Sequence, residues 1–262
     1  MSEYDPHAFV KSRPGAPGGF FALEAAGLRW LKEAEPDGGA RVVDVFEVGR
    51  NRLVLERVAE GASSASKARE FGQALAITHG AGAESYGAAP AGWEGDGYFG
   101  PLDDPRPMRL RPHATFGEYW ATDRIRPAVS ELGKRPGGYT PSELAVFDRL
   151  MERLCDGDFD DDEPPARVHG DLWWGNLMWD ERGAVLIDPA AHGGHREEDL
   201  AMLGMFGTRH LDDIIAGYES VHPLPDREER APLHRLYGVL MHAVLFGGGY
   251  AGQALDIAKK YV

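Results

Sequence analysis

The sequence has one cysteine and comparatively few positive charges. Cys155 alone cannot form an intramolecular disulfide, and it argues against a cysteine-based metal site. The 28 lysines and arginines face 42 aspartates and glutamates, so the formal net charge is -14. Nucleic acids and anionic membranes are bound by clustered Lys and Arg, so we expect neither as the main partner. The acidity chiefly favours solubility, although it also suits a cationic substrate.

The sequence also lacks a long hydrophobic run. Its longest apolar stretch, residues 236–246, contains His242 and is too short to span a bilayer. The first ten residues, MSEYDPHAFV, contain no apolar signal region. We therefore expect a cytoplasmic protein. Its 262 residues, 43% of them hydrophobic and 27% charged, suffice for one large soluble domain or for two lobes with a buried core.

The N-terminal part of the chain shows the pattern of a small α+β lobe. Residues 8–11 favour a short strand, and helical spacing of apolar residues begins at Phe20. Two β-branched runs, 41–48 and 52–58, are separated by a short turn and are typical of a hairpin. A strand, a helix and a hairpin together predict an N-terminal lobe that spans residues 1–58.

The rest of the chain, residues 59–262, has a mostly helical pattern, so the predicted fold is α+β with two lobes. Thr115 and Thr140, each followed three residues later by a glutamate, form capping boxes that mark helix starts. The predicted helices cover residues 68–79, 116–132, 141–155, 211–220 and one or two segments of 228–258. The Gly- and Pro-rich excursion 80–112 is expected to be irregular, and the acidic run 156–164 to be a solvated loop.

The stretch RVHGDLWWGNLMWD, residues 167–180, leads into a second hairpin. Apolar runs lie on both sides of a turn that contains Gly183, a residue suited to the positive φ of a tight turn. A hairpin brings its ends together, so Asn176 at one end should lie near Asp188 at the other. Asp171 lies on the loop before the hairpin. The pattern predicts that these three polar side chains converge, although Asp and Asn are also frequent turn residues.

An aspartate, an asparagine and a second aspartate in this order suit phosphoryl transfer. Asp171 would accept the proton of the attacking hydroxyl, while Asn176 and Asp188 would hold Mg²⁺ against the triphosphate. The same order and spacing occur in the catalytic loop of protein kinases, where a metal-binding aspartate follows the asparagine. The residues therefore predict a phosphotransferase that uses ATP and Mg²⁺.

Further features of a kinase are expected near the N-terminus. Lys11 would hold the α- and β-phosphates of ATP, and Glu24 on the next helix would pair with that lysine. The segment Glu56–Val58 would form the hinge between the lobes, where its backbone hydrogen-bonds adenine; otherwise it is only a linker. Kinases of this kind also carry a glycine-containing hairpin before the lysine, but the ten residues before Lys11 contain no glycine. Loss of that lid would weaken nucleotide binding and turnover.

Three segments resemble the fructosamine kinase (ketosamine-3-kinase) family, which belongs to the aminoglycoside-phosphotransferase-like kinases. They are VHGDLWWGN at 168–176, LIDPAAHGGHREEDLAML at 186–203 and RLYGVLMHAVLFGGGYA at 235–251. FVK and FFALEAAGLRWL near the N-terminus agree, so the likeness covers nearly the whole chain and is weakest across 80–112. The resemblance implies a bilobal protein-kinase-like fold with a shortened N-terminal lobe. It also implies ATP-dependent phosphorylation of a sugar hydroxyl of ketosamines, which is linked to deglycation.

The resemblance also implies roles for neighbouring residues. Trp173, two residues after Asp171, would pack against the sugar–amine substrate, because its flat face suits a sugar ring and can hold a cation nearby. His169 is expected to be structural rather than an acid or base, and Asp199 resembles the buried aspartate that braces the catalytic loop. The residues expected to serve packing or structure are Trp174, Trp179, Arg196 and Glu197.

Two other functions are compatible with the sequence. The protein could phosphorylate another small hydroxyl compound, such as an aminoglycoside or an amino alcohol, with the segment 80–112 lining the acceptor site. It could instead be a non-catalytic kinase-like binding module without the phosphate loop, although retention of the kinase residues argues against this. The expected partner is a small-molecule ketosamine or glycated amine, with no nucleic acid and no membrane. The pattern does not predict an oligomeric state.

Overall fold

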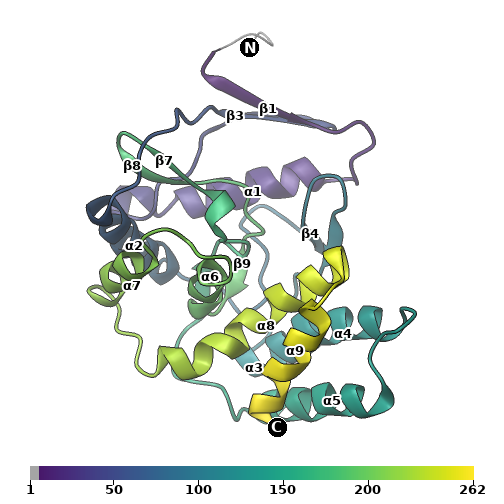
Figure 1. Ribbon diagram of the computed structural model, residues 1–262. Coiled ribbons are helices and arrows are strands. Elements are labelled where there is room, and N and C mark those ends of the chain that lie inside the picture. The colour runs from purple at the N-terminus through teal and green to yellow at the C-terminus, as the bar shows by residue number, and fades with distance from the viewer. Residues whose placement is uncertain (1–5) are drawn as a thin grey trace.

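Three antiparallel strands and one long helix form the N-terminal lobe (Figure 1). The strand order is β1–β3–β2, with β1 at Ala8–Ser12, β3 at Arg52–Glu56 and β2 at Val45–Val48. Helix α1, Phe20–Lys32, lies beside this sheet, and its buried face carries Leu28 and Leu31. The computed structural model describes residues 6–262. The predicted strand, helix and hairpin are all present in this part of the chain.

The first strand of the predicted hairpin is shorter than the β-branched run that predicts it. The expected strand 41–48 is regular only from Val45. Val42 instead forms a parallel bridge with Leu186, whose backbone N–H donates to the carbonyl of Arg41 at 2.9 Å. β3 likewise ends two residues earlier than predicted. The β-branched run favours extended backbone throughout, but its first half pairs with a distant strand, which a local pattern cannot indicate.

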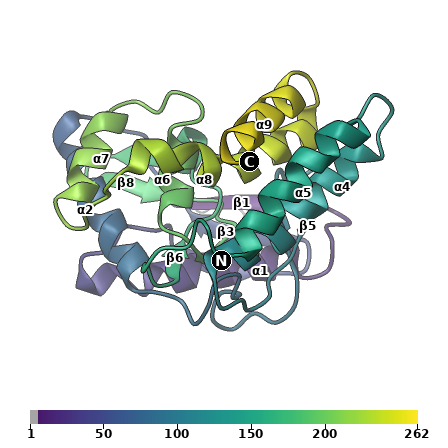
Figure 2. The ribbon, with the colours of Figure 1, turned by 90° about the horizontal axis from the view of Figure 1, so that it is seen from below.

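The remainder of the chain is mainly helical, as its pattern predicts (Figures 1 and 2). Its α-helices are α2 (Ala65–Gly80), α3 (Phe116–Tyr119), α4 (Arg126–Gly133), α5 (Pro141–Cys155), α6 (Glu197–Leu203), α7 (Leu211–Glu219), α8 (Arg227–Phe246) and α9 (Tyr250–Ala258). A π-helical turn, Trp120–Ile125, separates α3 from α4, so the predicted helix 116–132 consists of three consecutive pieces. The capping box at Thr140 is complete, whereas at Thr115 only the threonine hydroxyl caps the helix.

Two pairs of short strands do not follow from the sequence pattern. β4 (Gly97–Phe99) pairs with β5 (Arg106–Met108), so the segment 80–112 is not wholly irregular. β6 (Ala166–Val168) pairs with β9 (His192–Gly194), which holds the loop after Val168 beside the chain that follows Asp188. Each strand has only three residues, too few to show an alternation of polar and apolar side chains. The predicted second hairpin is confirmed as β7 (Leu177–Asp180) and β8 (Gly183–Leu186), with Gly183 at φ 138°.

The acidic segment 156–164 is bound to the protein rather than simply solvated. Asp160 accepts the backbone N–H of the second residue of α3 at 2.7 Å. Glu163 accepts hydrogen bonds from Arg196 Nε and from His222 Nε2, both at 2.7 Å. The prediction of a solvated loop is therefore wrong for these carboxylates, because each finds a donor on a distant element that sequence spacing does not reveal.

One hydrophobic cluster is common to both lobes. It contains Leu28 of α1, Leu53 of β3, Leu186 of β8 and Ile214 of α7, all of them fully buried. Figure 2 shows α2 next to α7 on one side of the molecule, and α4 and α5 next to α9 on the other. The shared cluster fixes β8, and with it the end of the second hairpin, against the N-terminal lobe. Within residues 6–262, no helix is long and apolar enough to cross a membrane.

Candidate active site

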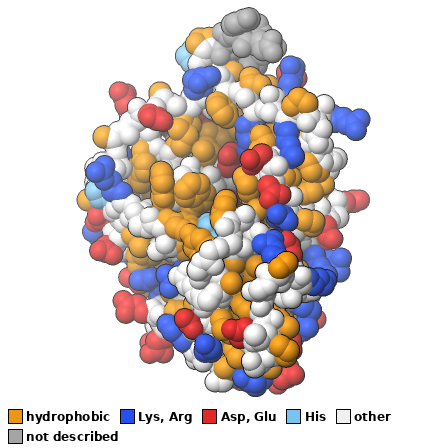
Figure 3. Space-filling model, turned by 45° about the vertical axis from the view of Figure 1, so that its right-hand side comes forward, with side chains coloured by type: hydrophobic (Ala, Val, Ile, Leu, Met, Phe, Trp, Pro, Cys, Tyr) orange, Lys and Arg blue, Asp and Glu red, His pale blue; other side chains and the backbone are white. Residues whose placement is uncertain are grey.

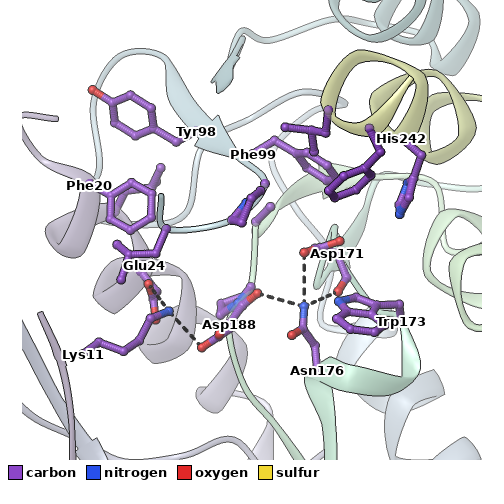
Figure 4. Close-up of a pocket in the computed structure, with 18 of the residues that line it drawn as sticks. Lys11, Phe20, Glu24, Tyr98, Phe99, Asp171, Trp173, Asn176, Asp188 and His242 are labelled. Atoms are coloured by element: carbon purple, nitrogen blue, oxygen red, sulfur yellow. Dashed lines mark hydrogen bonds and ion pairs between the residues drawn. The ribbon is translucent and has the colours of Figure 1, made fainter. Parts of the chain in front are cut away.

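The hairpin β7–β8 brings its two ends together, as the sequence predicts. Leu177 pairs with Leu186 at the open end of the hairpin. Asn176 Nδ2 donates to the backbone oxygen of Asp171 at 2.8 Å and to its Oδ2 at 3.1 Å. The same amide lies 3.4 Å from the backbone oxygen of Asp188. The three predicted polar residues therefore meet at one point (Figure 4).

The N-terminal lobe adds an ion pair to this point. Lys11 Nζ on β1 lies 2.8 Å and 2.9 Å from the two carboxylate oxygens of Glu24 on α1. It also lies 3.0 Å from Oδ1 of Asp188, so the lysine connects the two lobes (Figure 4). We call the set of Lys11, Glu24, Asp171, Asn176 and Asp188 the polar cluster. The predicted pairing of Lys11 with Glu24 is present, while its role in binding phosphates stays a prediction.

Burial and neighbouring carboxylates set the protonation of the polar cluster. Burial, together with the charges of Asp188 and Asp199, raises the pKa of Asp171 to about 7, although the hydrogen bond from Asn176 acts to lower it. Burial also acts to lower the pKa of Lys11, but its two carboxylate partners outweigh this and raise it above the usual value. Lys11 is therefore a permanent cation, whereas Asp171 changes its charge near neutral pH.

Asp199, in the first turn of α6, lies buried beneath the loop that carries His169 and Asp171, with 1% of its surface exposed. Its two carboxylate oxygens accept the backbone N–H groups of His169 at 2.7 Å and of Gly170 at 2.9 Å. His79 Nε2 lies 3.1 Å from the same carboxylate, and since a carboxylate only accepts, this nitrogen must donate. Although burial opposes it, these donors hold the pKa of Asp199 below its usual range. The contacts suit the predicted brace.

His169 uses both of its ring nitrogens inside the protein. Its Nε2 lies 2.8 Å from the carbonyl of Ile187 and donates to it. Its Nδ1 then accepts the backbone N–H of Asp171 at 3.3 Å. Burial lowers the pKa of the imidazole, so the ring is neutral at neutral pH. A neutral ring with both nitrogens occupied suits the predicted structural role better than proton transfer.

Two cavities meet at the polar cluster. The first, of about 620 Å³, is bounded by α1, the β4–β5 hairpin and the C-terminal helices, and most of its lining is apolar. Hydrophobic side chains gather around a hollow in the upper half of the face in Figure 3. The second cavity, of about 820 Å³, lies between β3, the chain after it and the β7–β8 hairpin. Trp174 and Asp188 line both cavities, so the two are adjacent.

The three tryptophans of the catalytic stretch face different surroundings. Trp173 lines the first cavity and lies over Gly175, where an added Cβ would be only 2.3 Å from the ring. Trp174 is 54% exposed, so the prediction that it packs in the core is wrong. Trp173 and Trp174 both line the first cavity, and Trp174 lies at its mouth with about half of its surface in solvent. Trp179 packs against Phe71 of α2, with ring centroids 6.4 Å apart, as expected for a packing residue.

The predicted hinge residues have separate surroundings. Glu56 directs its carboxylate to Arg41 at 2.7 Å and to Arg182 at 3.4 Å, so its side chain joins β3 to the turn of the second hairpin. Arg41 also pairs with Asp180, a contact that no spacing in the sequence indicates. Val58 lines the second cavity. A role of this segment in binding adenine stays a prediction.

Arg196 and Glu197 occupy buried structural positions, as their motif suggests. Arg196 donates to the hydroxyl of Tyr218 at 3.0 Å and pairs with Glu163 at 2.7 Å. Glu197 pairs with Arg230 of α8. These contacts attach the start of α6, and with it Asp199, to the surrounding helices.

Several residues of the first cavity are not indicated by any motif role. The segment 80–112 contributes Tyr98, Phe99 and Leu102, in keeping with the suggestion that it lines an acceptor site. Others come from the loop after α6 and from the C-terminal helices. They are Phe206, His242, Leu245, Phe246 and Tyr250. Their separation in sequence explains why a search for local spacing does not find them.

Comparisons with known proteins show the family to which the chain belongs. The model of the fructosamine kinase family matches residues 1–262. A "Probable ketoamine kinase" of Synechocystis is 32% identical over 255 residues, which is 96% of this chain and 82% of the relative. A crystal structure from Thermobifida fusca, described as a candidate fructosamine-3-kinase, is 42% identical with a TM-score of 0.85, over 96% of this chain and 84% of that one.

The wider fold is also shown by more distant structures. An ADP-bound aminoglycoside phosphotransferase superimposes with a TM-score of 0.63 at 12% identity, over 97% of this chain and 88% of that one. At this identity the likeness concerns the fold alone, which is the predicted two-lobed kinase-like α+β architecture. The family model matches the whole chain, so it shows the family as well as the fold. The chain belongs to the fructosamine kinase family, and so to the ATP-dependent phosphotransferases.

Proposed function

We propose that the protein transfers the γ-phosphoryl group of ATP to a sugar hydroxyl of a ketosamine, such as a fructosamine or ribulosamine adduct. The observation that carries this proposal is the position of the polar cluster, at the junction of two cavities. The second cavity would hold the nucleotide and the first the acceptor. The phosphoryl group would then cross the polar cluster, where Asp171 and Asp188 lie between the two substrates.

The second cavity suits a nucleotide base. Its lining includes apolar side chains from both lobes, with Val43 and Leu55 from the N-terminal lobe and Leu177 and Ile187 from the second hairpin and the chain after it. A flat heterocycle fits between such walls, and backbone groups near Val58 would hydrogen-bond its edge. Lys11, which is cationic and lies at the junction of the cavities, would bind the phosphates.

The polar cluster also supplies the hard oxygen donors that Mg²⁺ prefers. The carboxylate of Asp188 and the side-chain oxygen of Asn176 would hold the ion. Within residues 6–262, no three His, Cys, Asp or Glu side chains converge on a metal position. Mg²⁺ is commonly held by one or two carboxylates together with substrate phosphates, so this donor set fits a metal bound jointly with the nucleotide. When bound, the ion would neutralise charge on the phosphates.

Asp171 would accept the proton of the acceptor hydroxyl. As the hydroxyl oxygen forms its bond to the γ-phosphorus, the bond from that phosphorus to the β–γ bridging oxygen breaks and ADP leaves. A carboxylate whose pKa burial has raised to about 7 is a stronger base than a solvated aspartate. The hydrogen bond from Asn176 Nδ2, at 3.1 Å from Oδ2, would orient it.

The acceptor would give the reaction its biological outcome. A phosphorylated ketosamine is unstable, so its formation would free the amine and deglycate the metabolite or protein that carried it. Trp173 on the wall of the first cavity would contact the sugar–amine unit. The single cysteine suits the reducing cytoplasm in which we expect this activity.

An acceptor screen tests the proposed function. The protein is incubated with Mg·ATP and, separately, fructosyl-lysine, an aminoglycoside or choline, and release of ADP is followed together with phosphorus NMR of the product. We expect phosphate on the sugar of fructosyl-lysine and no comparable reaction of the other two. Turnover with the aminoglycoside or choline alone would assign another acceptor. Absence of ATP binding by calorimetry in the presence of Mg²⁺ would indicate a non-catalytic binding module.

A further inference from the structure

One wall of the first cavity is made of aromatic rings from three separate parts of the chain. Two rings follow the catalytic aspartate, one lies in the loop after α6, and three belong to α8 and α9. We call this set the aromatic wall. Its members are Trp173, Trp174, Phe206, His242, Phe246 and Tyr250.

The rings of the aromatic wall touch one another in series. The centroid of Trp173 lies 5.1 Å from that of Trp174 and 6.4 Å from that of Phe206, both in edge-on arrangements. The centroid of His242 lies 4.8 Å from Phe206 and 5.4 Å from Phe246. These separations are those of interacting aromatic pairs, so the wall is a continuous surface and not a set of scattered side chains.

The aromatic wall carries no charge. The charged residues that line the first cavity are Lys11, Glu24, Asp171 and Asp188, all of them members of the polar cluster. His242 donates its Nδ1 proton to the carbonyl of Gly238 at 2.8 Å, and burial lowers its pKa, so its ring is neutral at neutral pH. The region of the cavity away from the polar cluster therefore offers neither a cation for a carboxylate nor a carboxylate for an ammonium group.

Two rings of the wall lie at the mouth of the cavity. Trp174 is 54% exposed and Phe246 is 65% exposed, and both line the cavity. Exposed aromatic rings that adjoin a cavity continue its apolar surface outward, and such surfaces commonly mark the binding site of an apolar ligand. When the hydroxyl of an acceptor reaches Asp171, the rest of the acceptor would therefore lie along the aromatic wall.

We propose that the aromatic wall binds the substituent on the nitrogen of the ketosamine and selects apolar, above all aromatic, amines over amino acids linked through their α-nitrogen. The proposal rests on the proposed function. The sugar lies at Asp171, the amine nitrogen lies next to Trp173, and the nitrogen substituent extends over Phe206 and Phe246. An amino acid linked through its α-nitrogen, as in the glycine adduct, would place its carboxylate on this uncharged surface, where Lys11 is already paired and the loss of hydration has no compensation. An aryl group would instead gain apolar contact.

A matched series of acceptors tests this inference. Ketosamines made from one sugar with benzylamine, with glycine and with a diaminoalkane are compared by kcat/KM under saturating Mg·ATP. We expect the benzylamine adduct to exceed the glycine adduct about tenfold or more, a difference of about 1.4 kcal/mol. The diaminoalkane adduct carries a second ammonium group, and it reports whether the rings select a cation through their faces instead.

Two phenylalanine variants show whether the wall causes the preference. Phe246→Ala removes a ring that is 65% exposed, so the fold should persist, and we expect the benzylamine-to-glycine ratio to fall about three- to tenfold. Phe46→Ala makes the same chemical change at a ring on β2 that is 40% exposed and lies outside both cavity linings. That control should keep the ratio of the unmodified protein, and thermal unfolding verifies that both variants are folded.

Three results would overturn the inference while leaving the proposed function intact. They are equal or better use of the glycine adduct, a ratio that Phe246→Ala and Phe46→Ala change alike, and a marked preference for the diaminoalkane adduct. Failure to phosphorylate any of the three ketosamines would have a different meaning, because it would remove the proposed function and this inference with it.

Discussion

Replacement of Asp199 should show how much of the catalytic loop depends on one buried carboxylate. The wild-type side chain accepts two backbone N–H groups, at 2.7 and 2.9 Å, and an imidazole N–H at 3.1 Å. Asp199→Asn keeps the shape of the side chain but replaces one acceptor oxygen with an NH₂ group. One buried N–H then has no acceptor, which lowers the free energy of unfolding by about 2 kcal/mol. Asp199→Ala leaves all three donors without an acceptor, and we expect the free energy of unfolding to fall by about 4 kcal/mol.

Thermal unfolding at neutral pH measures these losses. For a chain of this size about 1 kcal/mol corresponds to roughly 2–4 °C in Tm, so we expect Tm to fall about 4–8 °C in Asp199→Asn and about 8–16 °C in Asp199→Ala. The pKa of Asp199 lies below its usual value, so this stabilisation is present above about pH 4 and is lost only as the pH falls through the lower folded value. Asp162→Ala, at an exposed position, is the control. A change in Tm below about 2 °C in Asp199→Ala would refute the brace.

Four further outcomes follow from the same contacts. Lys11→Met should lower kcat/KM for ATP about 30-fold, since a charge-assisted contact of about 2 kcal/mol is lost; an unchanged value contradicts its role in phosphate binding. Because burial raises the pKa of Asp171 to about 7, kcat/KM should rise with pH through that value, and a profile that is flat from about pH 5 to 8 would exclude it as the base. Gly175→Ala should displace the Trp173 ring and raise KM for the acceptor more than KM for ATP in steady-state kinetics. Arg41→Ala should lower Tm by about 2–4 °C, because it removes the ion pairs with Glu56 and Asp180. An unchanged Tm would show that these ion pairs contribute no stability.

The residues of the polar cluster could be predicted because their spacing is local. Asp171 and Asn176 lie five residues apart, and a two-stranded hairpin necessarily brings Asn176 close to Asp188. The partnership of Lys11 with Glu24 is similar, because a strand followed by one helix places the two side chains on facing elements. In each case the element that joins the residues can be recognised from its own periodicity.

Several features that the sequence does not reveal depend on contacts between distant segments. Val42 pairs with Leu186, 144 residues later, whereas its local sequence predicts the start of a hairpin strand. The aromatic wall combines side chains from positions as far apart as Trp173 and Tyr250. β-propensity and helical periodicity indicate which elements form, but not which distant surfaces they meet.

The errors over Trp174 and the acidic segment have the same origin. Large aromatic residues are usually buried, which favours a core position for Trp174, but this ring lies at the mouth of the cavities, where it is 54% exposed. Clustered acids usually face solvent, but Glu163 finds Arg196 and His222 on other elements. Residue type predicts burial only on average, whereas the contacts made in the folded protein determine whether an individual side chain is buried.

The central claim is that Asp171 is the base of a ketosamine kinase, and Asp171→Asn tests it most directly. The amide has nearly the same shape and keeps an oxygen to accept the hydrogen bond from Asn176, but it cannot take a proton from the acceptor. With Mg·ATP and fructosyl-lysine we expect kcat to fall roughly 10²–10⁴-fold, while calorimetry shows ATP binding close to that of the unmodified protein. A kcat within about twofold of the unmodified enzyme, with the variant folded, would contradict the account.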